Sequence, residues 1–280
     1  HKMTMFEMDL WMSLAYFIEQ EVDYCIIEAG MGGRLDATTA LDYKACLITN
    51  VGLDHTEYLG DTFEQIAYEK SGIFKPNVPA LTTEDKPECQ KVMELVADYM
   101  KTPLCFIDCQ ETDVLRWNGM TLHLNPPLYQ AKNLSLALET LSVLGIWLEE
   151  KEIQEVINHF QWAGRFMILR KEPLVLLDGA HNVHGITALT HSLKGFNGKI
   201  YFSVLKEKDA PHMIELLQSI SKDITLVEIS SARLYPLEKL GYSIITVDEL
   251  ISRLLDTKED SLLCGSLYYV GEVLEKWGNV

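Results

Sequence analysis

Three loops of this sequence carry residues that could hold a phosphate, a metal ion or a reacting carboxylate. They are EAGMGGRLDATT at 28–39, TNVGLDHTEYLG at 49–60 and DGAHN at 178–182. Each loop follows an apolar run that has the length and composition of a buried strand. Because parallel sheets bind ligands at the loops that leave the carboxyl ends of their strands, these loops are the first candidates for a functional site.

The first loop combines a carboxylate, glycines and two further charges, in the order Glu28, Gly30, Gly32, Gly33, Arg34 and Asp36. Glycines lack a Cβ and would let the backbone approach a ligand closely. The alternative is a tight turn in which Arg34 and Asp36 pair on the surface. The loop does not match the dinucleotide fingerprint, because Leu35 stands where the third glycine belongs.

The second loop delivers His55 beside Asp54. Glu28 and His55 then end two strands that we expect to be neighbours. One carboxylate and one imidazole suit a hard, partly hydrated cation such as Mg²⁺ only marginally. A solvated loop histidine is the alternative.

The third loop, DGAHN, ends an apolar strand at Asp178. Its polar residues suit a ligand site, but an Asp and an Asn that cap the next helix are an equally good interpretation. His181 and His184 stand at helical spacing, and the sequence offers no third metal ligand beside them.

The elements that must position these loops alternate along the chain. We expect helices at 4–20, 62–70 and 86–100, and strands at 22–29, 45–51, 78–82 and 103–107. This alternation predicts a parallel sheet covered on both faces.

The polar stretch from 110 to 127 interrupts the alternation and contains a predicted hairpin at Asn118 and Gly119. We therefore expect one domain at 1–127 and a second at 128–280. The second begins with a helix pair and continues with strands near 173–178, 199–205, 224–229, 242–247 and 261–265, separated by helices. Its pattern predicts another doubly wound α/β domain.

The bulk composition excludes several functional classes. A formal charge of -17 over 280 residues disfavours nucleic acid as a partner. No apolar run approaches the roughly 18 residues of a membrane span, so no membrane partner is expected. The six cysteines lack zinc-site spacing. They are expected to be free thiols in a reducing compartment such as the cytoplasm.

Further segments repeat the order of motifs in one known family: AYEKSGIFK (67–75), YQAKNLSLAL (129–138), WAGRF (162–166), VLKEKD (204–209) and GSLYYVGEV (265–273). With the three loops, they resemble the folylpolyglutamate synthase and dihydrofolate synthase family of the Mur ligase superfamily, from Thr4 to the C-terminus. The resemblance implies a partial P-loop-type central domain and a Rossmann-like C-terminal domain. It also implies a monomer.

The activity implied by this resemblance is ATP-dependent ligation. ATP phosphorylates a carboxylate, and the amine of L-glutamate attacks the acyl phosphate. The acceptor would be dihydropteroate, a reduced folate, or both, and Mg²⁺ would serve as cofactor. Such phosphoryl transfer relies mainly on positioning and on cations that spread charge.

The resemblance also assigns roles to individual residues. The implied metal ligands are Glu28, His55 and a carbamylated Lys70. Lys70, His55 and Arg165 would act in catalysis. The implied substrate-binding residues are Thr4, Met5, Phe6, Glu7, Arg34, Leu35, Asp36 and Ala37. The implied ATP-binding residues are Asn133, Arg165, Asp178, His181 and Asn182. Without the resemblance, Lys70 would be interpreted as an exposed lysine paired with Glu69, Asn133 as an ordinary helix residue, and Arg165 as a strand-edge charge.

One departure from the family is large: no G-x-x-x-x-G-K-[ST] phosphate loop occurs in the 280 residues. We therefore expect this chain to be inactive by itself. Two alternatives remain at this point. One is another Mur-type ligase acting on a cell-wall nucleotide precursor, which the GGRLDAT loop disfavours. The other is a non-catalytic ligand-binding relative.

Overall fold

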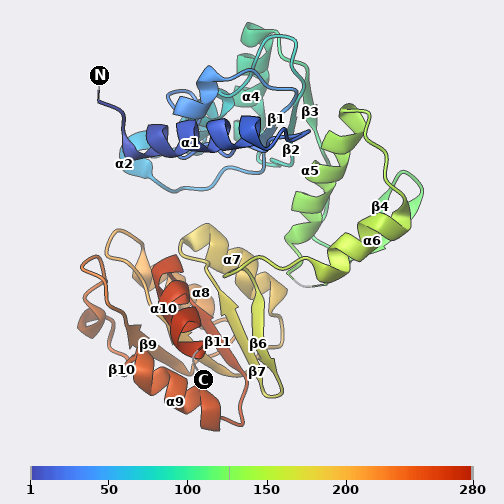
Figure 1. Ribbon diagram of the computed structural model, residues 1–280. Coiled ribbons are helices and arrows are strands. Elements are labelled where there is room, and N and C mark those ends of the chain that lie inside the picture. The colour runs from blue at the N-terminus through green and yellow to red at the C-terminus, as the bar shows by residue number, and fades with distance from the viewer. Residues whose placement is uncertain (1, 126, 279–280) are drawn as a thin grey trace. The chain divides into compact units, whose positions relative to one another are not determined.

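The structure, a computed structural model, describes residues 2–125 and 127–278. The chain forms two compact units (Figure 1). The first comprises the residues up to 110 together with 131–148, and the second comprises 111–130 together with the residues from 149 onward. This grouping reflects spatial contacts, and the domain boundary after residue 127 stays a prediction.

The first unit is built around a parallel sheet in the order β1-β2-β3. Its elements are α1 (Met5–Glu19), η1 (Ala37–Ala40), β1 (Cys46–Ile48), α2 (Thr56–Leu59), α3 (Phe63–Ser71), β2 (Ala80–Thr82), α4 (Pro87–Met100), β3 (Leu104–Phe106) and α5 (Gln130–Val143), the last of which begins at the unit boundary. Ile48 and Ala80 of the strands pack with Ile66 of α3 and Met93 of α4 in one buried cluster. This cluster fixes α3 against the sheet.

Local signals explain where the helices of this unit begin. Thr4 and Glu7 form a capping box at the start of α1, and Thr62 and Gln65 form another at α3. Pro87 occupies the first position of α4, where its missing N–H costs nothing. These helices therefore match the sequence prediction to within about two residues.

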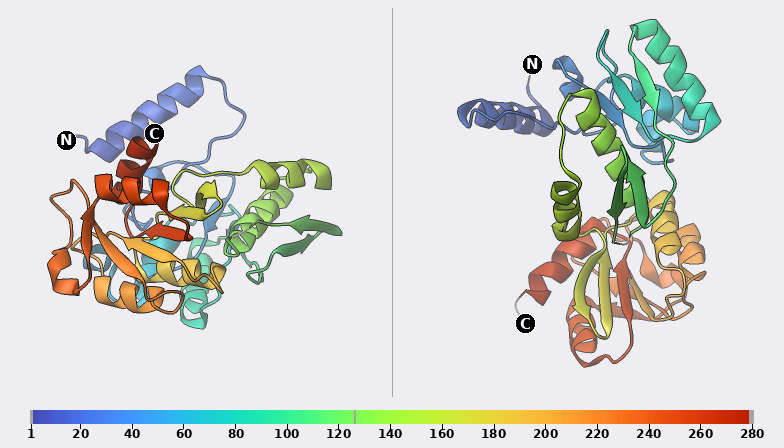
Figure 2. Two further views of the ribbon diagram at one scale, coloured as in Figure 1. Left: turned by 90° about the horizontal axis from the view of Figure 1, so that it is seen from below. Right: turned by 90° about the vertical axis from the view of Figure 1, so that its right-hand side faces the viewer.

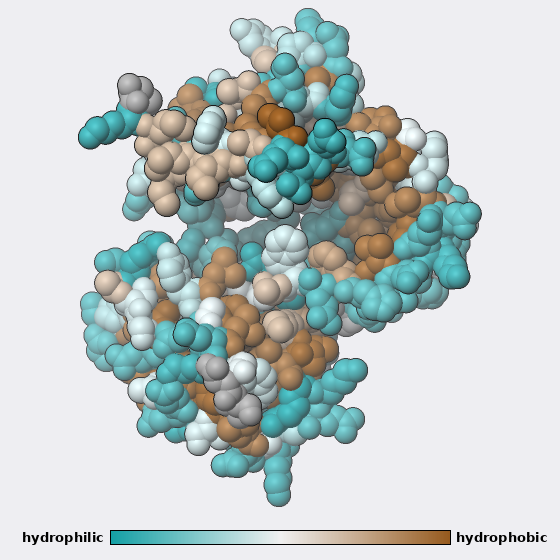
Figure 3. All heavy atoms as spheres, viewed as in Figure 1, coloured by the Kyte–Doolittle hydropathy of each residue, from teal (hydrophilic) through white to brown (hydrophobic). Residues whose placement is uncertain are grey.

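The predicted strand at 22–29 is wrong. The segment has no regular secondary structure and pairs with no strand in the described part of the chain, and Ile26 is 93% exposed. A strand needs a hydrogen-bonded neighbour as well as an apolar sequence, and β1 has its neighbour in β2. The helix before this segment, α1, has no buried residue among 5–19, and Trp11 and Met12 are exposed. Apolar side chains colour its surface brown in Figure 3.

The second unit contains a sheet in the order β10-β9-β8-β11-β7-β6. Its elements are β4 (Val114–Trp117), β5 (Met120–His123), α6 (Glu150–His159), β6 (Met167–Lys171), β7 (Leu174–Asp178), α7 (Val183–Ser192), β8 (Lys199–Phe202), α8 (Ala210–Leu217), β9 (Ile224–Glu228), η2 (Leu237–Leu240), β10 (Ile244–Thr246), α9 (Val247–Asp256), β11 (Ser261–Cys264) and α10 (Leu267–Trp277). All neighbours in this sheet are parallel except β6 and β7, which form an antiparallel edge that the sequence reading missed.

Both faces of this sheet are buried, as its continuous apolar strands predicted. Leu176 of β7 packs with α7 and α8, whereas its neighbours Val175 and Leu177 pack with α9 and α10. Figure 2 shows these helices flanking the strands of the unit. The predicted doubly wound architecture is confirmed.

The predicted hairpin is also present. β4 and β5 pair antiparallel, and the turn between them uses Asn118 at φ 47° and Gly119 at φ 81°. The side chain of Gln154 in α6 binds both backbone groups of His123, at 2.8 and 2.9 Å. No helix of residues 2–125 and 127–278 is long and apolar enough to cross a membrane.

Candidate active site

A partly buried lysine with acidic neighbours lies near the end of α3. Burial lowers the pKa of Lys70, while the nearby carboxylates of Asp54 and Glu28 act in the opposite direction. The net pKa is below the ordinary 10.5 of lysine, so the neutral amine is more accessible here than on an exposed lysine. Asp54 was missed as a site residue in the sequence, where only its adjacency to His55 pointed to it.

The glycine loop crosses α3 directly beside this lysine. A Cβ on Gly33 would lie 2.7 Å from the carbonyl oxygen of Lys70, and one on Gly72 would lie 2.2 Å from the Cα of Arg34. No side chain fits either position, so both glycines serve the crossing of two backbone segments. The approach of the loop glycines to a ligand stays a prediction, and in the structure Gly33 lies against the backbone of α3.

The charged pair that holds this crossing is Arg34 with Glu69. Their side chains bond at 3.0 Å (Nε to Oε1) and 2.9 Å (Nη2 to Oε1), and the Arg34 N–H donates to the Glu69 carbonyl at 2.8 Å. Two alternatives raised by the sequence are therefore wrong: Arg34 does not pair with Asp36, and Glu69 pairs with Arg34 instead of Lys70.

Asp36 closes the loop on itself. Its Oδ1 accepts from the N–H and hydroxyl of Thr38, at 2.9 and 2.6 Å, and its Oδ2 accepts from the N–H of Met31 at 3.0 Å. Burial acts to raise the pKa of Asp36, but these hydrogen bonds, led by those from Thr38, outweigh it, and the pKa is lowered. The carboxylate therefore fixes the shape of the loop at neutral pH.

We expect Asp36→Asn to lower the free energy of unfolding by about 1 kcal/mol, because the amide group then faces the Met31 N–H without an acceptor. A lowered folded pKa means that the carboxylate stabilises the loop above the ordinary pKa of 3.8 and loses this effect as pH falls through the folded pKa. Urea unfolding of both proteins from pH 7 down to pH 3 measures this. A stability difference that grows as the pH falls would contradict the assignment.

The start of α1 lies against the same loop. The Phe6 ring covers Gly30, where an added Cβ would come within 2.8 Å of it. Thr4 and Glu7 use their side chains in the capping box, with Thr4 N–H donating to Glu7 Oε2 at 2.6 Å. Met5 and Leu35 are 70% and 81% exposed, and Ala37 begins η1. The predicted substrate-binding segments are thus brought together through Phe6.

His55 sits at a strained backbone position. It has left-handed dihedrals, φ 51° and ψ 37°, and precedes α2 without a side-chain capping bond. Its N–H donates to Asp54 Oδ1 at 2.9 Å. Glu28 and His55 are both exposed. Among the described residues, no group of three or more His, Cys, Asp or Glu side chains could hold a metal.

In the second unit, Arg165 and Asp178 form a polar centre at the carboxyl end of β7. Asp178 is 3% exposed and accepts from the N–H groups of Phe166 and Ala180, each at 2.7 Å. Burial raises its pKa, although those bonds, Arg165 and His181 oppose the rise. Arg165 follows Gly164, which takes φ 74°, and its Nη1 lies 2.6 Å from where a Cβ of Gly179 would stand.

Tyr129 joins this centre and was not singled out from the sequence. Burial raises its pKa well above 10, with a further rise from Asp178, while Arg165 opposes both. The sequence placed Tyr129 at the start of a helical segment, and nothing in its spacing linked it to residues more than 30 positions away.

The remaining ATP-binding candidates have varied surroundings. Asn182 caps α7 through a bond of 2.7 Å from the Gly185 N–H, so the capping interpretation holds for Asn182 and not for Asp178. His181 Nδ1 lies 2.8 Å from the carbonyl oxygen of Gly179. Asn133 is exposed on α5 in the first unit.

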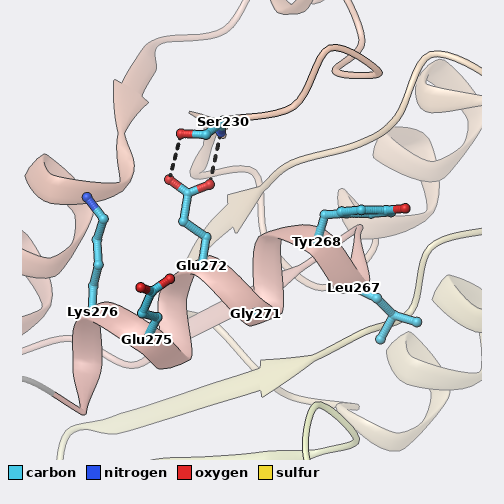
Figure 4. A pocket seen from close by; sticks show the side chains of 7 residues that line it. All are labelled: Ser230, Leu267, Tyr268, Gly271, Glu272, Glu275 and Lys276. Atoms are coloured by element: carbon cyan, nitrogen blue, oxygen red, sulfur yellow. Dashed lines mark hydrogen bonds between the residues drawn. The ribbon is translucent and has the colours of Figure 1, made fainter.

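An open pocket runs along α10 and contains none of these candidates (Figure 4). The Glu272 carboxylate accepts from the N–H and hydroxyl of Ser230 at 2.9 and 3.4 Å. The lining residues are Ser230, Leu267, Tyr268, Gly271, Glu272, Glu275 and Lys276. Ser230 thus holds the Glu272 carboxylate, and the pocket lies apart from the predicted site residues.

Comparison with known proteins identifies the relatives of this chain. Residues 1–123 match the Mur ligase middle domain. The dihydrofolate synthase/folylpolyglutamate synthase of Escherichia coli K12 is 31% identical, over 98% of this chain and 69% of that protein.

Solved structures agree with this result. Escherichia coli FolC in complex with DHPP and ADP superposes with a TM-score of 0.85 at 30% identity, covering 99% of this chain and 72% of that one. A bifunctional folylpolyglutamate synthase/dihydrofolate synthase with Mn, AMPPNP and L-glutamate bound gives 0.86 at 26% identity, with the same coverage. This chain therefore belongs to the dihydrofolate synthase/folylpolyglutamate synthase family of ATP-dependent ligases, within the Mur ligase superfamily.

Proposed function

We propose that the protein adds L-glutamate to dihydropteroate, to reduced folates or to both, through an acyl phosphate formed with ATP. The observation that carries this proposal is a partly buried Lys70, with the carboxylates of Asp54 and Glu28 near enough to act on its pKa, at the place where the loop that holds Arg34 crosses α3. Support comes also from the relatives, one of which was solved with DHPP and ADP and another with L-glutamate.

The residues around Lys70 fit a hydrated divalent cation. Mg²⁺ keeps several waters and needs only one or two protein carboxylates beside substrate phosphates, so the lack of a three-residue cluster among the described residues is no obstacle. Glu28, His55 and a carbamylated Lys70 would hold it. Such a cation spreads the charge of the transferring phosphoryl group.

Carbamylation is the chemistry that the surroundings of Lys70 favour. The lone pair of the neutral Nζ attacks the carbon of carbon dioxide and forms an N–C bond, while one C=O π pair moves onto oxygen and one Nζ proton leaves to solvent. The product is a carbamate whose single negative charge is shared by its two oxygens. Only the neutral amine can react, and burial increases its share by lowering the pKa. Carbamylation would thus replace the positive charge of a protonated Lys70 by an anionic oxygen donor, in addition to the carboxylates of Asp54 and Glu28.

The other side chains would bind and orient the substrates. Phe6 and the loop closed by Asp36 offer a fixed surface for the pterin-bearing substrate. Arg165 offers a planar, permanently charged fork to phosphate oxygens. Asp178 shapes the backbone beside it through Phe166 and Ala180, and its raised pKa limits the negative charge that it would present to a phosphate.

Nucleotide turnover tests the proposal. We expect the 280-residue chain to release ADP at a rate below detection, because backbone amides of a phosphate loop normally cradle the ATP phosphates. Joining an upstream segment that carries G-x-x-x-x-G-K-[ST] gives what we term the extended enzyme. It should release ADP only when L-glutamate and a pteroate or folate are both present.

Substrate controls decide between the family activities. Each assay omits one of ATP, L-glutamate and the pterin acceptor in turn. ADP release by the extended enzyme with a cell-wall nucleotide precursor, and never with a pteroate or folate, would exclude the proposed substrates. A folded extended enzyme that binds pteroate without any turnover would indicate a non-catalytic relative.

A further inference from the structure

A buried carboxylate outside the predicted site ties together the loops that follow β1 and β2. Glu84 follows β2, and its side chain is fully buried. Its Oε2 accepts a hydrogen bond from the N–H of Val51. Its Oε1 accepts from the N–H and Nζ of Lys86, at 2.8 and 3.1 Å. A buried carboxylate is costly unless its oxygens are bonded, so these contacts favour one arrangement of the two loops.

The loop after β1 is held at a second point. The hydroxyl of Thr83 donates to the Thr49 carbonyl at 2.6 Å, and Val51 is fully buried. Beyond this anchored segment the chain reaches Asp54, whose carboxylate acts on Lys70, and then His55 with its left-handed backbone. A non-glycine residue in that region persists only when the surrounding structure holds it there.

We propose that Glu84 is a positioning residue of the candidate active site, acting through Val51 to hold residues 49–55 so that Asp54 faces Lys70 and His55 keeps its backbone conformation. The hold on the loop follows from the hydrogen bonds alone. Its consequence for metal binding rests on the proposed function. This role could not be predicted from the sequence, because Glu84 lies in a loop without a recognisable motif.

Hydrogen exchange in the 280-residue chain tests the hold directly. Glu84→Ala should speed amide exchange in peptides covering 49–55 by about ten-fold or more, because Val51 loses its acceptor. Glu84→Gln keeps one carbonyl oxygen for Val51 but turns its NH2 group towards the N–H and Nζ of Lys86, so its exchange should fall between that of the parent and that of Glu84→Ala. Thr102→Val is the matched control, since Thr102 is buried in the same unit and donates to the Lys75 carbonyl at 2.8 Å, away from this loop.

All variants are compared well below their melting temperatures. Unchanged amide exchange at 49–55 in Glu84→Ala would overturn the proposal, because Glu84 would then not hold this loop. An equal change in Thr102→Val would also overturn it, because the effect would then follow from a general loss of stability. Binding of Mn²⁺, followed by electron paramagnetic resonance of the free ion, gives a second readout. The dissociation constant should rise about ten-fold in Glu84→Ala and stay near the parent value in Thr102→Val.

The two measurements separate this inference from the proposed function. If the parent chain binds no Mn²⁺ at all, the metal site is contradicted, and the exchange data still decide whether Glu84 holds the loop. If Mn²⁺ binds equally well to the parent and to Glu84→Ala, Glu84 does not position the site.

Discussion

Replacing Lys70 by Ala in the extended enzyme is expected to lower turnover by about 1000-fold, equivalent to about 4 kcal/mol of transition-state stabilisation. Lys70 is partly buried beside Asp54 and Glu28, and its removal takes away the amine that would carry the carbamate oxygens. The loss should appear in the turnover number more than in the KM of the pteroate. Steady-state ADP release at saturating substrate measures it.

Chemical rescue separates a carbamate from an ordinary lysine. The cavity left by Lys70→Ala is expected to admit a short carboxylate such as formate or acetate. Its two oxygens share one negative charge, as those of a carbamate do, and should restore part of the turnover. Lys70→Arg supplies a permanent cation instead, and should be as inactive as Lys70→Ala and insensitive to rescue. Substantial activity in Lys70→Arg would show that positive charge, and not a carbamate, is what the site requires.

Arg165→Ala in the extended enzyme is expected to lower turnover by roughly 30-fold to 1000-fold, which corresponds to about 2 to 4 kcal/mol. The guanidinium would act chiefly when charge redistributes during phosphoryl transfer, so ground-state binding of the pteroate should change less. Arg165→Lys should recover only part of the activity, because an ammonium keeps the charge and loses the fork. The kinetics of the two variants measure both effects.

Circular dichroism checks that each Arg165 variant is folded. Arg170 provides the control, since it lies on β6 and donates to the Pro173 carbonyl at 3.2 Å within the same unit. If Arg165 is only a strand-edge charge in a surface pair, either substitution should change the activation free energy of turnover by no more than about 1 kcal/mol. Near-normal turnover in Arg165→Ala would remove Arg165 from the active site.

Most of the architecture could be predicted from hydrophobic patterns, because strands buried on both faces read as continuous apolar runs. Leu176 and its neighbours in β7 show why: alternate side chains enter opposite clusters. The prediction failed at 22–29, where an equally apolar run pairs with no described strand. An apolar pattern indicates that a segment is suited to burial. Whether the segment forms a strand also depends on whether another strand lies beside it to share hydrogen bonds.

Site prediction from sequence depended on strand ends and on the family resemblance. It named Lys70 and Asp178, whose surroundings do shift their pKa values, downward and upward respectively. It missed Glu84 and Tyr129, because Glu84 acts on the loop after β1 through Val51 and Tyr129 lies near Asp178 and Arg165, all of them distant along the chain. When a side chain acts through contacts with residues distant along the chain, the spacing of its sequence neighbours does not predict its role.

The path of the chain between its two compact units limits how the protein can be divided. The chain passes from one unit to the other after residues 110, 130 and 148. The β4–β5 hairpin therefore belongs with α6, to which His123 is bonded by Gln154. A chimera joined after residue 127 would combine the hairpin of one parent with the α6 of another. Crossovers before residue 111 keep that pair together, so recombination between relatives should be tolerated better there than after residue 127.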